Sequence, residues 1–529
     1  MKKYIAGISV VLILLVLLFT RGLQKMKFTL FNPVSAERAE EVWQSRTRVE
    51  RFEFGSLLCN GIQVPVDYVE KTFYVPLDME NDQWETLEFA SADPAYQLIF
   101  SDDFTKYDKK QLLKDNADIE FLIYTDTEFS TYHMRFTGLP VIDISTQGGI
   151  ENQKEIAGQA VFYDTNFSTQ GIVSSAYNGH VRGNMSTLFP KKGYKMNLIR
   201  QKADGTVENN KLALFGMRED DDWILSALYN DDSKLREAVC IDLWSSMGAK
   251  NIYTNSTYNT AQTFVELIVD ESYYGLYALK EPIDAKQLNL QADDYSYKRE
   301  VPEDLNADVF AKAENPEEHV LGFEIKDGVL DQEAWQPMAY YSQILNGSDE
   351  QFEQNVGKLL DEDNAMRLWL YIQVIAGYDQ QKKNVYYVAR KEGNDYYFTF
   401  APWDLDLTWG NISGSDPQAL YTAYDENMIS EYFYWETGDR LIRQNVDGTA
   451  DKMQKLYKQL RGNELSDETL ETLVAKYDHI LRDSGAFARE ANRWPESALA
   501  DDADTVLNFA KERMAYLDAA LYDLENFMN

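Results

Sequence analysis

Residues 377–410 read GYDQQKKNVYYVARKEGNDYYFTFAPWDLDLTWG, and they predict the part of the fold that carries the chemistry. Two segments within them, VYYVAR at 385–390 and YYFTF at 396–400, are rich in β-branched and aromatic residues, which favours strands. The polar run KEGND between the two segments is typical of a turn. We therefore expect a β-hairpin that folds the chain back on itself.

Four polar residues flank this hairpin. Asp379 and Asn384, with the spacing D-x-x-x-x-N, bracket the loop before it, and Asp404 and Asp406 follow it. Because the hairpin returns the chain, we expect the four side chains to meet. An Asp and an Asn on a loop, followed by an acidic residue after a hairpin, is the layout with which protein kinases hold Mg²⁺ and orient a hydroxyl. Asp404 and Asp406 could also be the paired carboxylates of a carbohydrate-active enzyme. Residues two apart on an extended chain point the same way, so the pair could instead be a metal site.

The composition narrows the class of protein. The chain has 529 residues, of which 44% are hydrophobic and 26% charged, and these values are typical of a globular protein with several domains. Its formal net charge of −36 argues against nucleic acid as a partner, because phosphates need basic patches. Cys59 and Cys240 imply no disulfide framework, although one bridge between them stays open. The four histidines show no paired ligand spacing, which argues against a zinc site.

The N-terminus has the features of an export signal. Lys2 and Lys3 precede an apolar run from Tyr4 to Phe19. No small-residue cleavage pattern follows this run, so we favour an uncleaved transmembrane signal anchor over residues 1–24. The bulk of the chain would then lie outside the cytoplasm, held at the cell membrane by one helix. The alternative is a cleaved signal and a secreted protein.

Two further units are expected before the chemistry begins. Residues 25–50 have helical periodicity without a matching partner and are interpreted as a stalk. Residues 51–138 contain short alternating segments, such as KTFYVPL and IEFLIYT, separated by turn-like clusters. This pattern predicts a small antiparallel β-sandwich whose role is structural support or recognition.

Residues 139–285 are predicted to contain several strands and one helix. Within them RGNMSTLFPKKGYKMNL, at 182–198, is a polar Gly-containing turn followed by a strand with lysines. A lysine there would either bind phosphate or keep an edge strand of the sheet from pairing with another chain. The helix is expected over KLREAVCIDLWSSM, with Asp232 as its N-cap and Gly248 after its last turn. Glu237 on this helix would either pair with a strand lysine, as in kinases, or be solvated.

Residues 286–529 are predicted to be mostly helical. The polar segment 290–335 is expected to be a loop excursion. The apolar segment DNAMRLWLYIQVIAGY has helical length and ends just before Asp379. Before it, the segment TFVELIVDESYYGLYALKEPID, at 263–284, is a predicted hairpin that leads into a hinge between two lobes.

Three separated segments together resemble the CotH family, which is named for a bacterial spore-coat protein and regarded as a family of atypical protein kinases. The segments are RGNMSTLFPKKGYK, FVELIVDESYYGLYALKEPID, and YDQQKKNVYYV with its later FAPWDLDLTWG end. The stretch D-W-x-L-x-x-x-Y-x-D around Trp223 also matches. The resemblance runs from about Pro140 to Leu524 and leaves out residues 51–138. It implies an α+β fold with a kinase-like N-lobe at 139–285 and a C-lobe at 286–529.

The resemblance also implies individual roles. Asp379 would be the catalytic Asp, Asn384 and Asp404 would hold Mg²⁺ or Mn²⁺, and Asp406 would assist them. Contacts to ATP are implied for Arg182, Asn184, Lys192, Lys195 and Glu281. Sequence position favours Lys192 over Lys195 as the phosphate contact, and Glu281 would lie at the hinge beside the adenine.

Two positions depart from the family pattern. Family members often carry Arg after the catalytic Asp and His before the Asn, whereas this chain has Gln380 and Lys383. Because phosphoryl transfer depends mainly on positioning and metal electrostatics, we still expect activity.

The expected function is therefore that of an exported, membrane-anchored Ser/Thr protein kinase acting on a cell-surface or spore-coat protein. A basic, Ser-rich acceptor would complement the acidic chain. Two alternatives remain. One is a scaffold or binding protein with a kinase-like fold and no turnover, and the other is a carbohydrate-active enzyme that uses Asp404 and Asp406.

Overall fold

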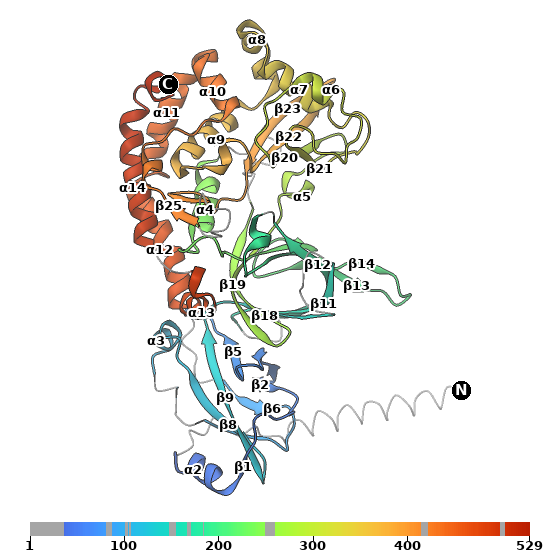
Figure 1. Cartoon of the computed structure of the whole chain (residues 1–529), viewed down its shortest axis with the longest axis vertical. Helices are drawn as coiled ribbons and strands as arrows, with labels where there is room; N and C mark the ends of the chain where they lie inside the picture. The colour runs from blue at the N-terminus through green and yellow to red at the C-terminus, as the bar shows by residue number, and fades with distance from the viewer. Residues whose placement is uncertain are drawn as a thin grey trace, which may run out of the picture.

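The computed structural model describes residues 36–80, 87–100, 104, 107–147, 155–166, 171–183, 185–248, 260–413, 422–497 and 503–528. The predicted signal anchor at 1–24 and the predicted nucleotide contact Asn184 lie outside these residues. Within the described ranges, no helix combines the length and the apolar character needed to cross a membrane. In Figure 1 the N-terminal unit lies at the bottom, a β-barrel in the middle and a mostly helical lobe at the top.

The described part of the N-terminal unit contains two sheets and two helices. Its helices are α2 (Ala36–Ser45) and α3 (Lys109–Lys114). Its strands are β1 (Thr47–Arg48), β2 (Leu57–Cys59), β3 (Ile62–Gln63), β4 (Val66–Asp67), β5 (Thr72–Pro76), β6 (Phe89–Ser91), β7 (Gln97–Phe100), β8 (Ile119–Tyr124) and β9 (Glu128–Thr137). One sheet has the order β4-β5-β9-β8-β7 with β1 beside β9, the other has the order β3-β2-β6, and the two share one apolar core.

The N-terminal unit differs from the sequence-based expectation in two respects. Strand β9 pairs in parallel with both β1 and β5, so the larger sheet is mixed rather than antiparallel. Alternation along a strand predicts which face is buried but not the direction of the neighbouring strand. In addition, Ala39 and Val42 of helix α2 are buried against Ile99 and Leu122. The described part of the predicted stalk is therefore packed on the sheet.

The central part is a closed β-barrel with one helix. Its strands are β10 (Val141–Thr146), β11 (Ile156–Tyr163), β12 (Ile172–Arg182), β13 (Gly193–Gln201), β14 (Val207–Asn209), β17 (Asp222–Ser226), β18 (Gln262–Val269) and β19 (Ser272–Lys280), with the small pair β15 (Leu212–Ala213) and β16 (Glu219–Asp220). The sheet order is β12-β11-β10-β18-β19-β17-β13-β14, and an additional pairing of β12 with β13 closes the ring. Alternation is clear on β13, where Tyr194 and Met196 point into the barrel core while Lys195 is partly exposed.

Helix α4 (Arg236–Met247) begins later than the sequence predicts. The predicted cap, Asp232, does not cap it, because the backbone N–H of Arg236 donates to Asp231 Oδ2 at 2.9 Å. Asp231 also holds Ser233 and the guanidinium of Arg236, so the residues before the helix form a side-chain-bonded loop. The predicted stop at Gly248 is confirmed.

The C-terminal lobe consists of helices around one four-stranded sheet. Its sheet strands are β20 (Tyr295–Arg299), β21 (Phe323–Asp327), β22 (Val385–Glu392) and β23 (Asp395–Pro402), in the order β21-β20-β22-β23. Its helices are α5 (Ala285–Leu288), α6 (Ala307–Ala311), α7 (Gln336–Leu345), α8 (Asp349–Leu359), α9 (Glu362–Ile375), α10 (Glu436–Arg443), α11 (Thr449–Arg461), α12 (Asp467–Asp483), α13 (Ala486–Arg493), α14 (Ala503–Ala520) and α15 (Leu524–Phe527). Short elements complete it: β24 (Asn411–Ser413), β25 (Thr422–Tyr424) and the 3-10 turns η3 (Asp379–Gln381), η4 (Glu426–Ile429), η5 (Val446–Gly448) and η6 (Pro495–Ser497).

The predicted hairpin is confirmed as β22 and β23, but the expected loop excursion at 290–335 is wrong. That segment contributes β20, which pairs with β22, and β21, which covers the outer side of β20. Its two strands are short and carry charged residues on one face, so the segment has the polar composition of a loop and its strands were not predicted.

The barrel and the C-terminal lobe meet at a small apolar cluster. Ile224 of β17, Ile283 and Leu288 pack there against the hairpin residues Tyr386 and Trp403. Helices α12 and α13 descend along one side of the barrel to the N-terminal unit (Figure 1). The end of the hairpin meets the barrel through Trp403, which lies against Lys280 of β19, and through Asp406, which accepts a hydrogen bond from Asn230 after β17.

Candidate active site

Asp379 lies on a short turn fixed by the buried helix α9. The helix ends at Ala376, which has a left-handed φ of 49°, and the chain then turns sharply through Gly377. Asp379 opens turn η3 and is buried. Its Oδ2 accepts from Lys383 Nζ at 2.8 Å and from Asn384 Nδ2 at 3.2 Å.

Asn384 joins Asp379 to the residues after the hairpin. Its Nδ2 donates to Asp379 Oδ2 and also to Asp404 Oδ2 at 3.4 Å. The structure therefore brings Asp379, Asn384 and Asp404 together, as the sequence predicts. Asn384 and Asp404 have positive φ values of 56° and 58°, a left-handed conformation that Asn and Asp tolerate best and that is often found at functional sites.

Asp406 lies in the same region but has different partners. Its Oδ1 accepts from the backbone N–H of Leu407 at 3.0 Å, and its Oδ2 accepts a hydrogen bond from Asn230. Asn411 Nδ2 donates to the carbonyls of both Asn230 and Asp406. Asp406 therefore ties the loop after the hairpin to the loop before α4. The left-handed turn at Asp404 breaks the extended chain on which the two carboxylates were expected to point the same way.

Lys280, the last residue of β19, faces the end of the hairpin from the barrel side. Its Nζ forms a buried ion pair with Glu237 of α4. Of the two alternatives that the sequence left for Glu237, the structure shows the pairing with a strand lysine. The same Nζ lies 4.6 Å from the centroid of the Trp403 ring, and the guanidinium carbon of Arg182 lies 5.9 Å from that centroid. Two cations therefore face the indole that immediately precedes Asp404, a favourable cation–π arrangement.

The two predicted phosphate lysines lie elsewhere. Lys192 Nζ donates to the carbonyls of Thr187 and Phe189 and so stabilises its own turn. Lys195 projects from the outer face of the barrel and lies 3.7 Å from Asp222 Oδ1. It is in register with Ile224, which is in register with Lys280, so the side chains of Lys195 and Lys280 leave the same face two strands apart.

Glu281 lies at the hinge, but its carboxylate is occupied. Its Oε1 accepts from the backbone N–H of Arg218 at 2.8 Å, and its own N–H donates to the carbonyl of Ala261. The carbonyl of Glu281 also accepts a hydrogen bond from Thr260 Oγ1, so its backbone and its carboxylate both have partners within the protein.

The electrostatics of the site reflect burial and crowding of carboxylates. Burial raises the pKa of Asp379, and Asp404 adds to this effect while Lys383 opposes it. Burial, Asp404 and Glu237 raise the pKa of Asp406 well above its usual range. Burial lowers the pKa of Lys383, but Asp379, Asp404 and Asp406 outweigh it and raise that pKa above its ordinary value.

Three residues of the site were missed by the sequence analysis. Lys280 ends a hairpin and precedes Glu281-Pro282, a position that a search for strand-end lysines would have found. Gln380 Nε2 donates to the carbonyls of Trp403 and Asp404, both at 2.9 Å, and so joins the loop of Asp379 to that of Asp404. Asn230 carries no local pattern that marks its contact with Asp406.

The residues present fit a divalent cation. Asn384 and Asp404 offer amide and carboxylate oxygens, the hard ligands that Mg²⁺ and Mn²⁺ prefer. The amide nitrogen of Asn384 points to the two carboxylates, and a 180° rotation of the amide would bring its Oδ1 to the same side as the carboxylate of Asp404. Asp404 is exposed, and its side chain is accessible to an ion from solvent.

Two features lie outside this cluster. Glu300, His319 and Glu324 bring potential ligand atoms within 4.8 Å of one another, which the spacing of the histidines did not reveal. Lys298 and Lys326 already pair with the two glutamates.

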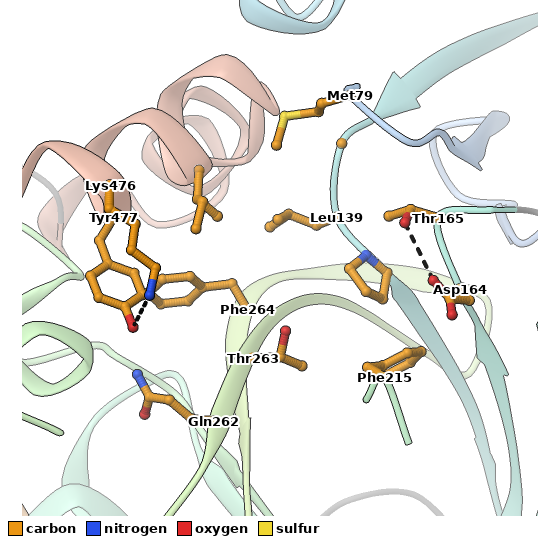
Figure 2. A pocket seen from close by; sticks show the side chains of 13 residues that line it. Met79, Leu139, Asp164, Thr165, Phe215, Gln262, Thr263, Phe264, Lys476 and Tyr477 are labelled. Atoms are coloured by element: carbon orange, nitrogen blue, oxygen red, sulfur yellow. Dashed lines mark hydrogen bonds between the residues drawn. The ribbon is translucent and has the colours of Figure 1, made fainter. Parts of the chain in front are cut away.

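A cavity of about 400 Å³ also opens where the N-terminal unit, the barrel and α12 meet, with Leu139 and Phe264 on its wall (Figure 2). Cys59 and Cys240 are both free and buried.

A barrel lobe and a helical lobe that meet at a Lys–Glu ion pair and an Asp–Asn–Asp cluster define a kinase-like protein. The family model for CotH kinase protein matches residues 180–517, and the chain belongs to the CotH kinase family. The search of curated proteins finds no match.

Among solved structures, the crystal structure of a Helicobacter pylori proinflammatory kinase, CtkA, is similar at 11% sequence identity. The match covers 63% of this chain and 95% of that chain, with a TM-score of 0.23, a likeness too low to support a conclusion about this chain.

Proposed function

We propose that the protein is a protein kinase that transfers the γ-phosphate of ATP to Ser or Thr hydroxyls of a protein acceptor, with Mg²⁺ or Mn²⁺. The observation that carries this proposal is the amide of Asn384, which joins Asp379 to Asp404 beside the buried Lys280–Glu237 pair. These are the parts that phosphoryl transfer needs: an acceptor-orienting carboxylate, metal ligands and a phosphate-binding cation.

The residues divide the chemistry as follows. Asp379 orients the acceptor hydroxyl and receives its proton, and its raised pKa suits that role. Lys280 and Arg182 bind phosphate oxygens from the barrel side, and Glu237 fixes the ammonium of Lys280. A divalent cation held by Asn384 and Asp404 would neutralise charge on the phosphates.

The setting of the protein is proposed from the sequence. The basic and apolar start of the chain supports export and a single-pass membrane anchor, with secretion as the alternative. The net charge of −36 supports a basic, Ser-rich acceptor on a cell surface or coat. ATP is scarce outside cells, so this placement requires a local supply of nucleotide.

Labelling with radioactive ATP tests the proposed reaction. The chain from residue 25 onward, incubated with Mg²⁺ or Mn²⁺ and a basic Ser-rich protein, should incorporate phosphate. Asp404→Asn should reduce labelling by about 100-fold or more, because an amide cannot replace the charge of a metal-binding carboxylate. Asp395→Asn is the matched control, since Asp395 is exposed at the far end of the same hairpin.

The other outcomes have definite meanings. Equal labelling by the wild type and by Asp404→Asn would remove the proposed role of Asp404. Nucleotide binding without any labelling would support a catalytically silent scaffold instead. Glycan hydrolysis abolished by Asp404→Asn would support the carbohydrate-active alternative.

A further inference from the structure

In the described part of the chain, Lys383 is a partly exposed cation in contact with Asp379, the proposed catalytic carboxylate. Its Nζ lies 2.8 Å from Asp379 Oδ2, and its side chain is 38% exposed while that of Asp379 is 9% exposed. The same oxygen also accepts from Asn384 Nδ2. Without substrate, Asp379 Oδ2 is therefore fully engaged by neighbours on its own loop.

The other cations of the described site are held in different ways. Lys280 is 2% exposed and is fixed by the buried carboxylate of Glu237. Arg182 faces Trp403 from the barrel side. Lys383 comes from the C-terminal lobe, stands on a flexible four-carbon stem and pairs only with the residue that orients the acceptor.

The charges around Lys383 show what it can do. Lys383 Nζ lies beside Asp379 Oδ2, and Asn384 links that oxygen to Asp404, so the ammonium stands at the edge of the carboxylate cluster. When the phosphates and the metal charge enter that cluster, the most negative point moves from the carboxylates to the transferring group. A lysine within reach of Asp379 is then also within reach of the phosphoryl group that the Asp379-bound hydroxyl attacks.

We propose that Lys383 is a second catalytic residue, which leaves Asp379 when substrates bind and contacts the transferring phosphoryl group. This inference rests on the proposed kinase function. In the step, the acceptor oxygen forms a bond to the γ-phosphorus while the bond from that phosphorus to the β–γ bridging oxygen breaks. The electron pair goes to the departing ADP, and the hydroxyl proton goes to Asp379. Lys383 supplies charge and donates no proton, and its departure frees Asp379 Oδ2 for the acceptor.

Two neighbouring lysines make a matched test. Lys383→Gln removes the proposed cation, and Lys382→Gln makes the same change one residue earlier, on an exposed side chain for which the structure shows no ion pair. We expect Lys383→Gln to lower kcat by about 10²–10³-fold, the usual effect of removing one donor from a charge-stabilising site. The KM for ATP should change by no more than about threefold, and Lys382→Gln should behave as wild type. Lys383→Arg should recover part of the loss because it restores the charge.

A binding measurement separates catalysis from structure. ADP with aluminium fluoride and Mg²⁺ mimics the transferring phosphoryl group, and its Kd should rise by about 10-fold or more in Lys383→Gln while the Kd for ATP stays within about threefold. A merely structural role would weaken both ligands equally. Lys383→Met provides a second variant if the glutamine variant does not fold.

Each result decides one of the two proposals. If the wild type labels its acceptor and Lys383→Gln has an unchanged or higher kcat, Lys383 is not catalytic and the kinase proposal stands. If the wild type neither labels an acceptor nor binds nucleotide, the kinase proposal fails and the role of Lys383 fails with it. If the wild type binds nucleotide without labelling, equal Kd values for the aluminium fluoride complex in both proteins exclude the proposed contact.

Discussion

At the scale of single residues, the structure separates what residue types can predict from what they cannot. Asp379, Asn384 and Asp404 were predictable, because one hairpin between them leaves few ways to arrange the chain. Lys280 was not, because its partner Glu237 lies 43 positions away along the chain and the pairing depends on how α4 packs on the barrel. The predicted contacts of Lys192 and Lys195 with ATP stay predictions, since sequence shows that a strand carries lysines but not which of them meets a carboxylate.

Asp143 on β10 provides a test of buried charge outside the active site. Burial raises the pKa of Asp143 to about 6, and the like charges of Glu271 and Asp270 add to this effect. The ordinary value is 3.8, so the native state favours the protonated form. The associated stability is fully present below about pH 4 and is lost as the pH rises through about 6.

Asp143→Asn should therefore stabilise the protein above pH 7 and have little effect at pH 4. The expected gain is about 1–3 kcal/mol in the free energy of unfolding, from roughly 1.4 kcal/mol per unit of pKa. Urea unfolding at both pH values measures it, with Asp126→Asn as an exposed control. A gain of the same size at both pH values would show that the charge of Asp143 is not the cause.

At the scale of elements, periodicity predicted the type of most segments, while pairings and starts needed the three-dimensional structure. The apolar stripe of α4 was clear, but its first turn is replaced by a loop that Asp231 organises. The closure of the barrel through β12 and β13 has no local signal, since each strand alternates in the same way in an open sheet. Strands β20 and β21 were hidden because their charged faces resemble a loop.

Helix α13 holds the turn before β13 through a buried ion pair. Lys191 Nζ lies 2.6 Å from Glu490 Oε1, and both side chains are fully buried. Glu490 Oε2 also accepts from the backbone N–H of Leu276. One carboxylate thus joins helix α13 to strand β19 and to the turn before β13.

Glu490→Gln should destabilise the protein by about 3–5 kcal/mol, because it leaves the cation of Lys191 buried without a counter-charge. Adding Lys191→Met should recover part of that loss, since the unpaired charge is removed. Urea unfolding of the four proteins of this double-mutant cycle measures the coupling, with Glu512→Gln on the exposed face of α14 as the control. Additive losses would mean that the two side chains do not stabilise each other.

At the scale of the whole molecule, the N-terminal unit and the kinase-like part share buried contacts. Arg489 of α13 forms two bonds to Glu266 of the barrel, at 2.6 and 2.9 Å, and donates to Asn116 Oδ1 at 3.0 Å. The apolar core of the N-terminal unit also includes Ile268 and Tyr273 from the barrel. Sequence patterns placed a boundary near residue 138, but a boundary in the pattern carries no information about how tightly the two sides pack.

Removal of the N-terminal unit should therefore destabilise the kinase-like part. A chain that starts at residue 139 leaves Arg489 without Asn116 and exposes apolar side chains of β18 and β19 that the unit covers. We expect its Tm to fall by about 10 °C or more relative to a chain that starts at residue 36. We also expect the longer chain to unfold in a single calorimetric transition, because an interface with buried charge and a shared core couples the unfolding of its two sides. Two separate transitions in the longer chain, the upper one at the Tm of the shorter chain, would contradict this and would make the N-terminal unit an independent domain. Arg489→Met in the longer chain tests the link directly, since it removes the bonds to Glu266 and Asn116 while the apolar contacts remain.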